Sequence, residues 1–319
     1  METFTVISFN LELDGGPDEH GRPSQRWHDA HEALAAHDPA ILLRQEATRS
    51  RADGHARLHL AERALGGMRG FLAPAGVGQH PTAIFVRPDV LTVTHQYELT
   101  DWRTPPTNII ATLDGAPRVP IILMSWHNTP TSPRQREREA DDISRLVGVG
   151  RHGGWIGGGD CNEYPAPDGE TVPQIDWTTV RDLPHIQYRT NPGPDGTLES
   201  CTYLDRKLLG CGLHDVARYA AHTLGQREAL SHTAGWAPGT EDQGGYSRLD
   251  RIYGDPYLVQ AVIKVEVLDI DGSDHKAVKA VFHHGRAIDA LHRKVAPLAP
   301  LKLTAPGRPR RAGHDCAIG

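Results

Sequence analysis

The sequence has little cysteine, and no two cysteines have the spacing of a metal-binding pair. The four cysteines, Cys161, Cys201, Cys211 and Cys316, are scattered through the second half of the 319 residues. So few and so scattered cysteines exclude a disulfide scaffold. Cys201, Cys211 and His214 could supply three zinc ligands, but no CxxC pair or second histidine at finger spacing accompanies them. Buried thiols are therefore the favoured interpretation.

Long apolar runs are also absent. The best run, residues 121–124, has the length of a strand and is far short of the roughly 18 residues of a membrane span. Residues 1–10 have neither a basic start nor a long apolar stretch, so we expect no signal peptide, no membrane partner and a cytoplasmic location. The formal net charge of −6 excludes a global basic field, although a local basic groove that binds nucleic acid remains open.

Short strand-like segments are what the sequence has in abundance. Runs rich in β-branched and aromatic residues predict strands over 4–10, 40–43, 82–86, 91–97, 108–113, 119–126, 155–156, 249–253, 259–268 and 277–282. Apolar residues at helical spacing predict helices over 27–36, after a cap at Ser24, and over 134–147, after Pro133. Because strands outnumber helices, we expect an α/β fold of stacked sheets covered by helices.

A change of composition near residue 284 suggests a domain boundary. Residues 285–319 contain seven Arg or Lys against two Asp, together with four prolines. We therefore expect one domain over residues 1–284, a short helix over 286–294 and then a mobile basic tail.

Polar side chains stand at or just after the ends of five apolar runs. They are Asn10 with Glu12, Glu46, His127, Asp160 with Asn162, and Asp274 with His275. Any one of them is typical of a turn or cap. Their joint occurrence is harder to explain by turns, and strand ends are where a rigid scaffold can hold several charged groups near one point.

The order and spacing of these groups resemble the endonuclease/exonuclease/phosphatase superfamily, which includes DNase I-like and abasic-site nucleases and several phosphatases. The segments that resemble it run from about residue 3 to 284 and read ISFN (7–10), LLRQE (42–46), MSWH (124–127), GDCN (159–162), RLDRI (248–252) and SDH (273–275). The resemblance implies a four-layer α/β/β/α sandwich of two packed, mainly antiparallel sheets, with the site at one edge.

The resemblance also implies a divalent metal, expected to be Mg²⁺, with Mn²⁺ as the other candidate. Glu46 matches the main metal ligand, and Asn10 the first-strand amide that organises phosphate and metal. Glu12 and Asp274 match further carboxylates of the metal site. Mg²⁺ prefers a few carboxylates and keeps several of its waters, which suits such a set.

The remaining matches imply catalytic roles. Asp160 resembles the carboxylate that orients or deprotonates the attacking water, and Asn162 the amide that positions it. Asp250 and His275 match an Asp–His pair, and His127 the histidine that binds phosphate or protonates the leaving oxygen. Hydrolysis of a phosphoester needs these three kinds of help: an oriented water, charge neutralisation and protonation of the departing oxygen.

Three further residues are predicted to bind substrate. Arg44 stands where the family usually has an apolar residue, which suggests an exposed strand end or a substrate contact. Asn128 lies in the His-x-x-Pro segment after His127, and Arg248 precedes Asp250. We expect all three to lie near the bound phosphoester.

The function favoured by these observations is Mg²⁺-dependent hydrolysis of nucleic-acid phosphodiesters. A phosphatase or phosphodiesterase of a small molecule or lipid headgroup is the alternative, and a non-catalytic binding module is a second. Arg134, Arg136 and Arg138 could line a groove for nucleic acid, or form a solvated helix face paired with nearby acidic residues. DNA or RNA, endo or exo action, and the oligomeric state stay open.

Overall fold

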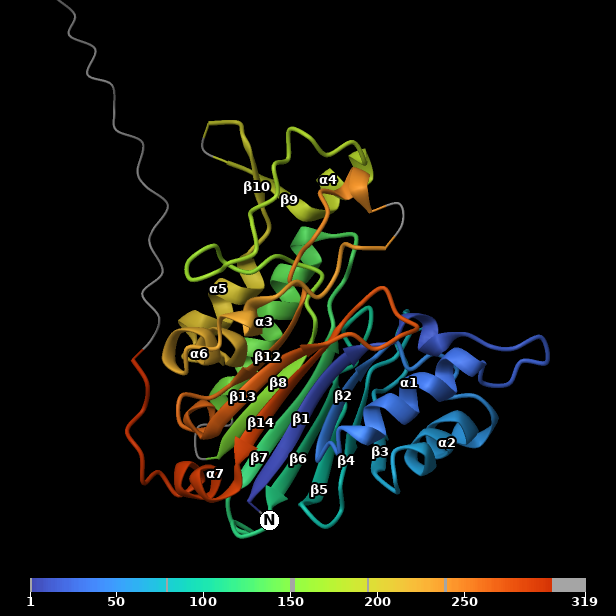
Figure 1. Ribbon diagram of the computed structural model, residues 1–319, viewed down its shortest axis with the longest axis vertical. Coiled ribbons are helices and arrows are strands. Elements are labelled where there is room, and N and C mark those ends of the chain that lie inside the picture. Colours follow the sequence, from blue (N-terminus) through green and yellow to red (C-terminus); the bar gives the residue numbers. More distant parts are fainter. Residues whose placement is uncertain (1, 79, 150–152, 194, 238–239, 300–319) are drawn as a thin grey trace, which may run out of the picture.

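Two six-stranded sheets packed face to face form the centre of the computed structural model, which describes residues 2–78, 80–149, 153–193, 195–237 and 240–299 (Figure 1). The first sheet has the order β13-β14-β1-β2-β4-β3 and the second the order β11-β12-β8-β7-β6-β5. In each sheet the third and fourth strands, β1–β2 and β8–β7, are parallel, and all other neighbours are antiparallel. The two sheets therefore share one pattern of strand directions.

The strands of the first sheet are β1 (Thr3–Asn10), β2 (Ile41–Gln45), β3 (Arg69–Leu72), β4 (Ala83–Val86), β13 (Val262–Leu268) and β14 (Ala277–His283). Those of the second are β5 (Leu91–Tyr97), β6 (Thr107–Leu113), β7 (Pro120–His127), β8 (Gly154–Asp160), β11 (His214–Asp215) and β12 (Asp250–Gly254).

Alternating side chains of the central strands fill two different cores. In β1, Phe4 and Val6 pack between the sheets, whereas Ile7 and Phe9 pack under the helices on the outer face. Both faces of the strand are therefore buried, which explains why apolar residues occur on both of its faces.

Helices cover both outer faces, which completes the four-layer α/β/β/α sandwich. In Figure 1, α1 (Gln25–Ala36) and α2 (Ala56–Ala64) lie on the right and cover the first sheet. Further to the left, α3 (Pro133–Val149) and α5 (Tyr203–Gly210) cover the second sheet. The predicted cap is present, because the Ser24 hydroxyl accepts a hydrogen bond from the Trp27 N–H at 3.2 Å. Near the β13 side, α6 (Val216–Thr223) contacts β12 and β13, and α7 (His284–Leu291) packs against β14.

Several elements differ from those expected. Residues 258–261 form a 3-10 turn before β13, so that strand starts later than predicted, and α7 occupies 284–291 instead of 286–294. The long loops expected before residue 200 contain α4 (Leu183–Arg189), β9 (Thr190–Pro192) and β10 (Leu198–Ser200), at the top of Figure 1. The predicted basic tail lies outside the described residues from residue 300 onward.

Close contacts near the strand ends occur both between the two sheets and between neighbouring strands of one sheet. The Gln45 side chain donates to the Ser125 hydroxyl at 3.0 Å, and that hydroxyl donates to the Arg44 carbonyl at 3.1 Å, which joins the two sheets. In β8, a Cβ on Gly159 would lie 1.9 Å from the Trp126 carbonyl oxygen, so only glycine fits. None of the helices in the described ranges is long and apolar enough to cross a membrane.

Candidate active site

The predicted polar residues meet at one edge of the sandwich. Because β1 and β2 are parallel, as are β7 and β8, their carboxyl ends lie side by side within each sheet. Asn10 ends β1, Glu46 follows β2, and His127 and Asp160 end β7 and β8 as register partners. Asp250, the first residue of β12, is the register partner of Asp160 on its other side.

Asp160 is the centre of this arrangement. Its side chain is buried, and its Oδ2 accepts hydrogen bonds at 3.2 Å from the amide nitrogens of both Asn10 and Asn162. The same oxygen lies 3.5 Å from His127 Nε2 and 3.7 Å from His275 Nε2. One carboxylate thus faces two amides and two imidazoles that come from both sheets.

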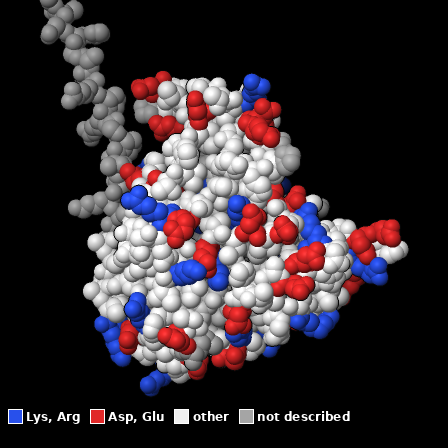
Figure 2. Space-filling model, viewed as in Figure 1, with Lys and Arg blue, Asp and Glu red and all other residues white. Residues whose placement is uncertain are grey.

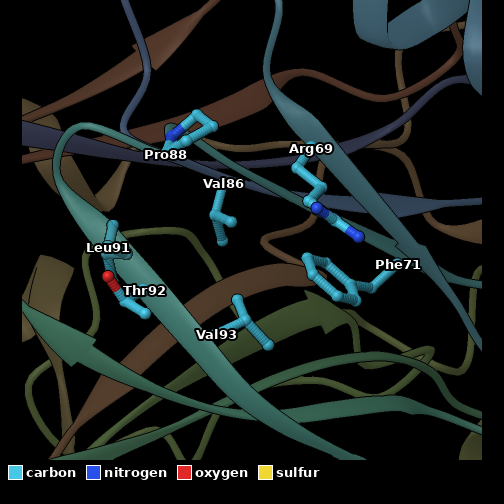
Figure 3. Close-up of a pocket in the computed structure, with 7 residues that line it drawn as sticks. All are labelled: Arg69, Phe71, Val86, Pro88, Leu91, Thr92 and Val93. Carbon is cyan, nitrogen blue, oxygen red and sulfur yellow. The ribbon is translucent and has the colours of Figure 1, made fainter.

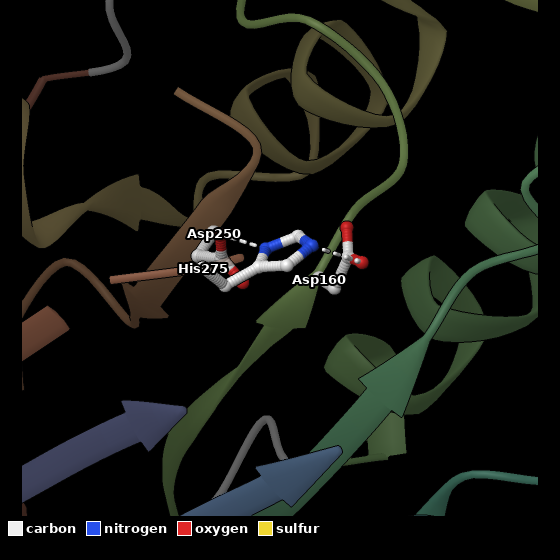
Figure 4. A group of neighbouring side chains, drawn as sticks. All are labelled: Asp160, Asp250 and His275. Atoms are coloured by element: carbon white, nitrogen blue, oxygen red, sulfur yellow. Dashed lines mark hydrogen bonds and ion pairs between the residues drawn. The ribbon is translucent and has the colours of Figure 1, made fainter. Parts of the chain in front are cut away.

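Asp250 and His275 form the predicted pair (Figure 4). Asp250 Oδ2 accepts a hydrogen bond from His275 Nδ1 at 2.8 Å, which leaves Nε2 directed toward Asp160. The Thr233 hydroxyl accepts from the Asp250 N–H at 2.9 Å, and the Ser273 hydroxyl accepts from the His275 N–H at 3.1 Å. The backbone N–H of each member of the pair is therefore bound by a hydroxyl group.

The charges of these groups support one another. Burial alone would lower the pKa of His275, but the carboxylates of Asp250 and Asp160 outweigh it and raise this pKa well above its ordinary value. Burial would likewise raise the pKa of Asp160, but the positive charges of His275, His127 and Arg189 lower it. At neutral pH the site therefore holds an ionised Asp160 beside a protonated His275.

Glu46 extends from a left-handed backbone position, with φ of 55°. Its Oε2 accepts a hydrogen bond from the Leu13 N–H at 2.8 Å, and its Oε1 lies 3.5 Å from Asn10 Nδ2 and 4.0 Å from His127 Nε2. Asn162 also has a positive φ, 48°. Two non-glycine residues in this sparsely populated region lie at one site, as strained residues at functional sites often do.

The oxygen atoms of Asn10, Glu46 and Asp160 fit a divalent cation. Among the described residues the buried Asn10 Oδ1 has no hydrogen-bond partner, and carboxylate and amide oxygens are the donors that Mg²⁺ and Mn²⁺ take. Asp160, Asp250 and His275 also place ligand atoms within 4.8 Å of one another. That group is less suitable, because both ring nitrogens of His275 already face carboxylates and its pKa is raised.

Glu12 and Asp274, the other predicted metal-site residues, lie at the rim. Glu12 pairs with Arg26 at 3.1 Å, and Asp274 Oδ1 lies 4.0 Å from His275 Nε2. Burial raises the pKa of Asp274 and His275 lowers it, while the nearby charges of Glu12 and Asp160 raise it further. The two rim carboxylates therefore add to the negative charge that surrounds Asp160.

Arg44, Asn128 and Arg248, the residues predicted to bind substrate, have buried side chains that are already paired within the protein. Arg44 donates to Asp14 Oδ1 at 2.6 Å, and Arg248 donates to Glu170 and Asp215 at 2.5 and 2.7 Å. Both arginines therefore form buried ion pairs that join different segments of the fold.

Asn128 is buried for a different purpose. Its side-chain amide nitrogen donates to Glu139 Oε2 at 3.0 Å, and its backbone carbonyl oxygen accepts from Asn162 Nδ2 at 2.9 Å. It therefore helps to hold the Asn162 amide, and does so without reaching the solvent.

The helix α3 arginines divide between the two roles considered above. Arg136 is fully buried and donates to the Thr129 and Tyr188 carbonyls, whereas Arg134 and Arg138 are exposed. A groove lined by all three arginines is therefore excluded.

The sequence pattern missed Arg189, which ends α4. Its guanidinium donates to the Asn162 carbonyl and, at 2.6 Å, to Asn162 Oδ1. With both oxygens of Asn162 held, the amide nitrogen is left to face Asp160. Arg189 lies in a loop region of weak pattern, and the lone arginine there gave no signal that could have identified it.

Two other places in the described part of the chain differ from this site. The hollow between β3, β4 and β5 in Figure 3 has a volume of about 310 Å³ and is lined by Phe71, Val86, Val93 and other residues, with Arg69 as its charged group. In the described part of the chain, Cys201, Cys211 and His214 do not form a ligand cluster, and Cys211 is exposed. The strand-end cluster is therefore the candidate active site.

The sandwich and the groups at its edge define a DNase I-like phosphoesterase. A model of the Endonuclease/Exonuclease/phosphatase family matches residues 7–275, which is most of the chain, so the chain belongs to this family. No curated protein sequence matches it.

Solved structures with the same fold are distant in sequence. An AP endonuclease from Leishmania major is 15% identical, with a TM-score of 0.61 over 89% of this chain and 88% of its own. A humanized TDP2 from D. rerio is 15% identical, with a TM-score of 0.56 over 88% and 99%. The endonuclease domain of TRAS1, a telomere-specific non-LTR retrotransposon, is 20% identical, with a TM-score of 0.53 over 88% and 98%.

Proposed function

We propose that this protein hydrolyses nucleic-acid phosphodiesters with the help of Mg²⁺, for which Mn²⁺ can substitute. The observation that supports this most strongly is the shared Asp160 carboxylate, whose Oδ2 lies within 3.7 Å of the Nε2 atoms of both His127 and His275. A buried anion between two imidazoles has little structural purpose, whereas phosphoester hydrolysis requires both kinds of group.

Glu46, Asp160 and Asn10 would hold the metal, with Glu12 and Asp274 at the rim. When bound, the cation would neutralise charge on the phosphoryl oxygens and position the substrate. The chain's own groups do the rest. Asp160 and the Asn162 amide orient the attacking water, and Arg189 keeps that amide turned toward Asp160.

The two histidines are placed to act on the phosphate. His275 is protonated at neutral pH, so its Nε2–H can donate to a phosphoryl oxygen while Asp250 holds the ring through Nδ1. His127 Nε2 faces the same point and can donate to the departing oxygen. The charge that develops in the transition state is thereby met by fixed donors.

Nucleic acid is favoured as the substrate class by what the similar structures contain. A D. rerio TDP2 that is 14% identical to this chain was solved with a single-strand DNA product, and another neighbour is an AP endonuclease. A hollow of about 140 Å³ beside His275, lined also by Asn162, Tyr164 and Arg189, favours the second candidate, hydrolysis of a small phosphoester.

The test is a comparison of substrates under matched conditions. The protein is incubated with Mg²⁺, Mn²⁺ or EDTA and with supercoiled plasmid, a single-stranded oligonucleotide, an abasic-site duplex, bis(p-nitrophenyl) phosphate or phosphate monoesters. We expect metal-dependent cleavage of at least one nucleic acid, lost in the Asp160→Asn variant. Turnover of monoesters alone would select the second candidate, and no turnover in any sample would reject both.

A further inference from the structure

A third hollow, of about 440 Å³, lies between the loop that precedes α1 and the start of α2. Its lining includes the guanidinium groups of Arg22, Arg49 and Arg57, together with one carboxylate, that of Asp53. Its volume is in the range of small-molecule sites, and its charged lining suits an anion.

The positive charge in this hollow is only partly compensated. Arg22 pairs with Asp18 at 2.9 Å, and Arg57 lies 3.5 Å from Asp14. Asp14 is also the partner of the buried Arg44, at 2.6 Å. The single negative charge of Asp14 is thus shared between Arg44 and Arg57.

Arg49 completes the excess of positive charge. It is exposed, and among the described residues its guanidinium has no hydrogen bond or ion pair. Burial and the positive charge of Arg49 lower the pKa of Arg57, whereas Asp14 raises it. The two guanidiniums therefore repel each other, and an anion between them would remove that cost.

The hollow is joined to the candidate active site by short connections. Arg49 follows Glu46 by three residues, so their Cα atoms are at most roughly 11 Å apart. On the other side, Leu13 donates its N–H to Glu46 Oε2, and the next residue, Asp14, contacts Arg57. The hollow is therefore connected to the metal-site residue Glu46 through two short segments of the chain, residues 46–49 and residues 13–14.

We propose that this hollow binds a phosphate group other than the one being hydrolysed, held by Arg49 and Arg57 with Arg22 at the rim. The proposal rests on the proposed phosphoesterase function. Guanidinium groups suit phosphate because their donors form a planar fork that matches two of its oxygens. On the face in Figure 2, acidic and basic side chains are interspersed, so a local phosphate site is a better source of affinity than a broad basic surface.

The phosphate could come from either of two sources. One is a neighbouring phosphodiester of a nucleic-acid strand, and the other is a second phosphate of a small polyphosphorylated substrate. Both present the same chemistry to the arginines, so the experiment includes an arm for each.

The experiment compares the wild-type protein with Arg49→Gln and with the control Arg63→Gln. Arg63 is an exposed arginine on the same helix as Arg57 that does not line the hollow. In the first arm, binding of a fluorescent twelve-nucleotide single strand is measured by anisotropy in EDTA at several salt concentrations. In the second arm, inorganic pyrophosphate is titrated in EDTA and followed by calorimetry.

If the phosphate belongs to a strand, Arg49→Gln weakens oligonucleotide binding roughly tenfold, as loss of a charged hydrogen bond would. It also lowers the slope of log K against log salt by about 1, while Arg63→Gln changes neither. If the phosphate belongs to a small molecule, pyrophosphate binding is lost in Arg49→Gln and oligonucleotide binding is unchanged.

Equal behaviour of wild type, Arg49→Gln and Arg63→Gln in both arms would overturn the proposal. Both arms are binding measurements without metal, so they do not depend on turnover. Failure of the catalytic proposal would instead appear as intact bis(p-nitrophenyl) phosphate and intact nucleic acids with Mg²⁺ and with Mn²⁺.

Discussion

The side chain of His275 lies between two carboxylates, and each has a different effect on it. Asp250 fixes the ring through Nδ1, and Asp160 faces Nε2. Changing Asp250 to Asn keeps the volume but removes the charge and can stabilise the wrong tautomer. We expect turnover to fall by about 10⁴, as in other sites that lose an orienting carboxylate, with metal affinity nearly unchanged.

The double variant tests whether the two residues act as a unit. Asp250→Asn combined with His275→Ala should cost little more in turnover than His275→Ala alone. Rate losses that multiply fully would show that Asp250 and His275 act independently, and circular dichroism of each variant controls for folding.

Glu46 is the residue on which the metal prediction depends. In Glu46→Gln the new side-chain oxygen can still accept the Leu13 N–H, so the loop keeps its shape while one negative charge is lost. Metal affinity measured by calorimetry should fall roughly tenfold or more. An unchanged affinity would place the metal elsewhere, with the Asp160, Asp250 and His275 group as the next candidate.

Arg189 is predicted to be a positioning residue. Arg189→Lys keeps the positive charge but cannot hold both oxygens of Asn162 at once. We expect kcat to fall roughly tenfold with little change in KM, because the water is misplaced while the substrate still binds. A change confined to KM, or to the melting temperature, would assign Arg189 a binding or a structural role.

Residues of the site differ in how far the sequence could identify them. Asn10, Glu46, His127 and Asp160 were predictable because each follows an apolar run, and the ends of parallel strands meet at one edge. Arg44 was misjudged because a charged residue in a buried strand looks exposed unless its partner, Asp14, is known. That partner is 30 residues away, and no local pattern records it.

Among the structural elements, β8 contains a position that tolerates no side chain. Adding a Cβ at Gly159 would force it to 1.9 Å from the Trp126 carbonyl oxygen, so β7 and β8 would have to separate. We expect Gly159→Ala to lower the free energy of unfolding by about 3 kcal/mol, measured by urea denaturation. In the control Gly210→Ala, the new Cβ meets nothing within 4 Å, and stability should change little.

Element prediction succeeded where a buried strand imposes a local composition. The central strands are apolar on both faces, and their β-branched residues mark them. In contrast, α2 and β3 were not predicted. The four residues of β3 are too short for a periodic pattern, and α2 is rich in charged residues and held by packing on α1 and β3.

Stability of the whole molecule should depend on pH through His31. This histidine is buried in α1, stacked on Trp27 at 3.8 Å, and burial lowers its pKa from 6.5 to about 3. Between pH 6.5 and 3 the unfolded chain therefore binds a proton that the native state does not. Its contribution to the free energy of unfolding should fall with decreasing pH by at most about 1.4 kcal/mol per unit, and be fully present above pH 6.5.

The variant His31→Phe keeps the stacking and removes the titrating group. Urea unfolding of both proteins between pH 7 and 4 gives the difference in stability, in which all other titrations cancel. We expect the variant to gain stability relative to the wild type as the pH falls. Parallel curves would show that the pKa of His31 is the same in the native and the unfolded protein.

Several contacts at the site run from one sheet to the other. Asn10 and Glu46 belong to the first sheet and meet Asp160 and His127 of the second, while Asp250 of the second sheet holds His275, which leads into β14 of the first. Neither half of the sandwich contains a working set by itself. The geometry of the candidate active site therefore depends on the relative position of the two sheets. A small slide of one sheet against the other would misalign all the contacts that cross between them at the same time. We therefore expect substitutions of side chains buried between the sheets to abolish the proposed activity under conditions in which the protein remains folded.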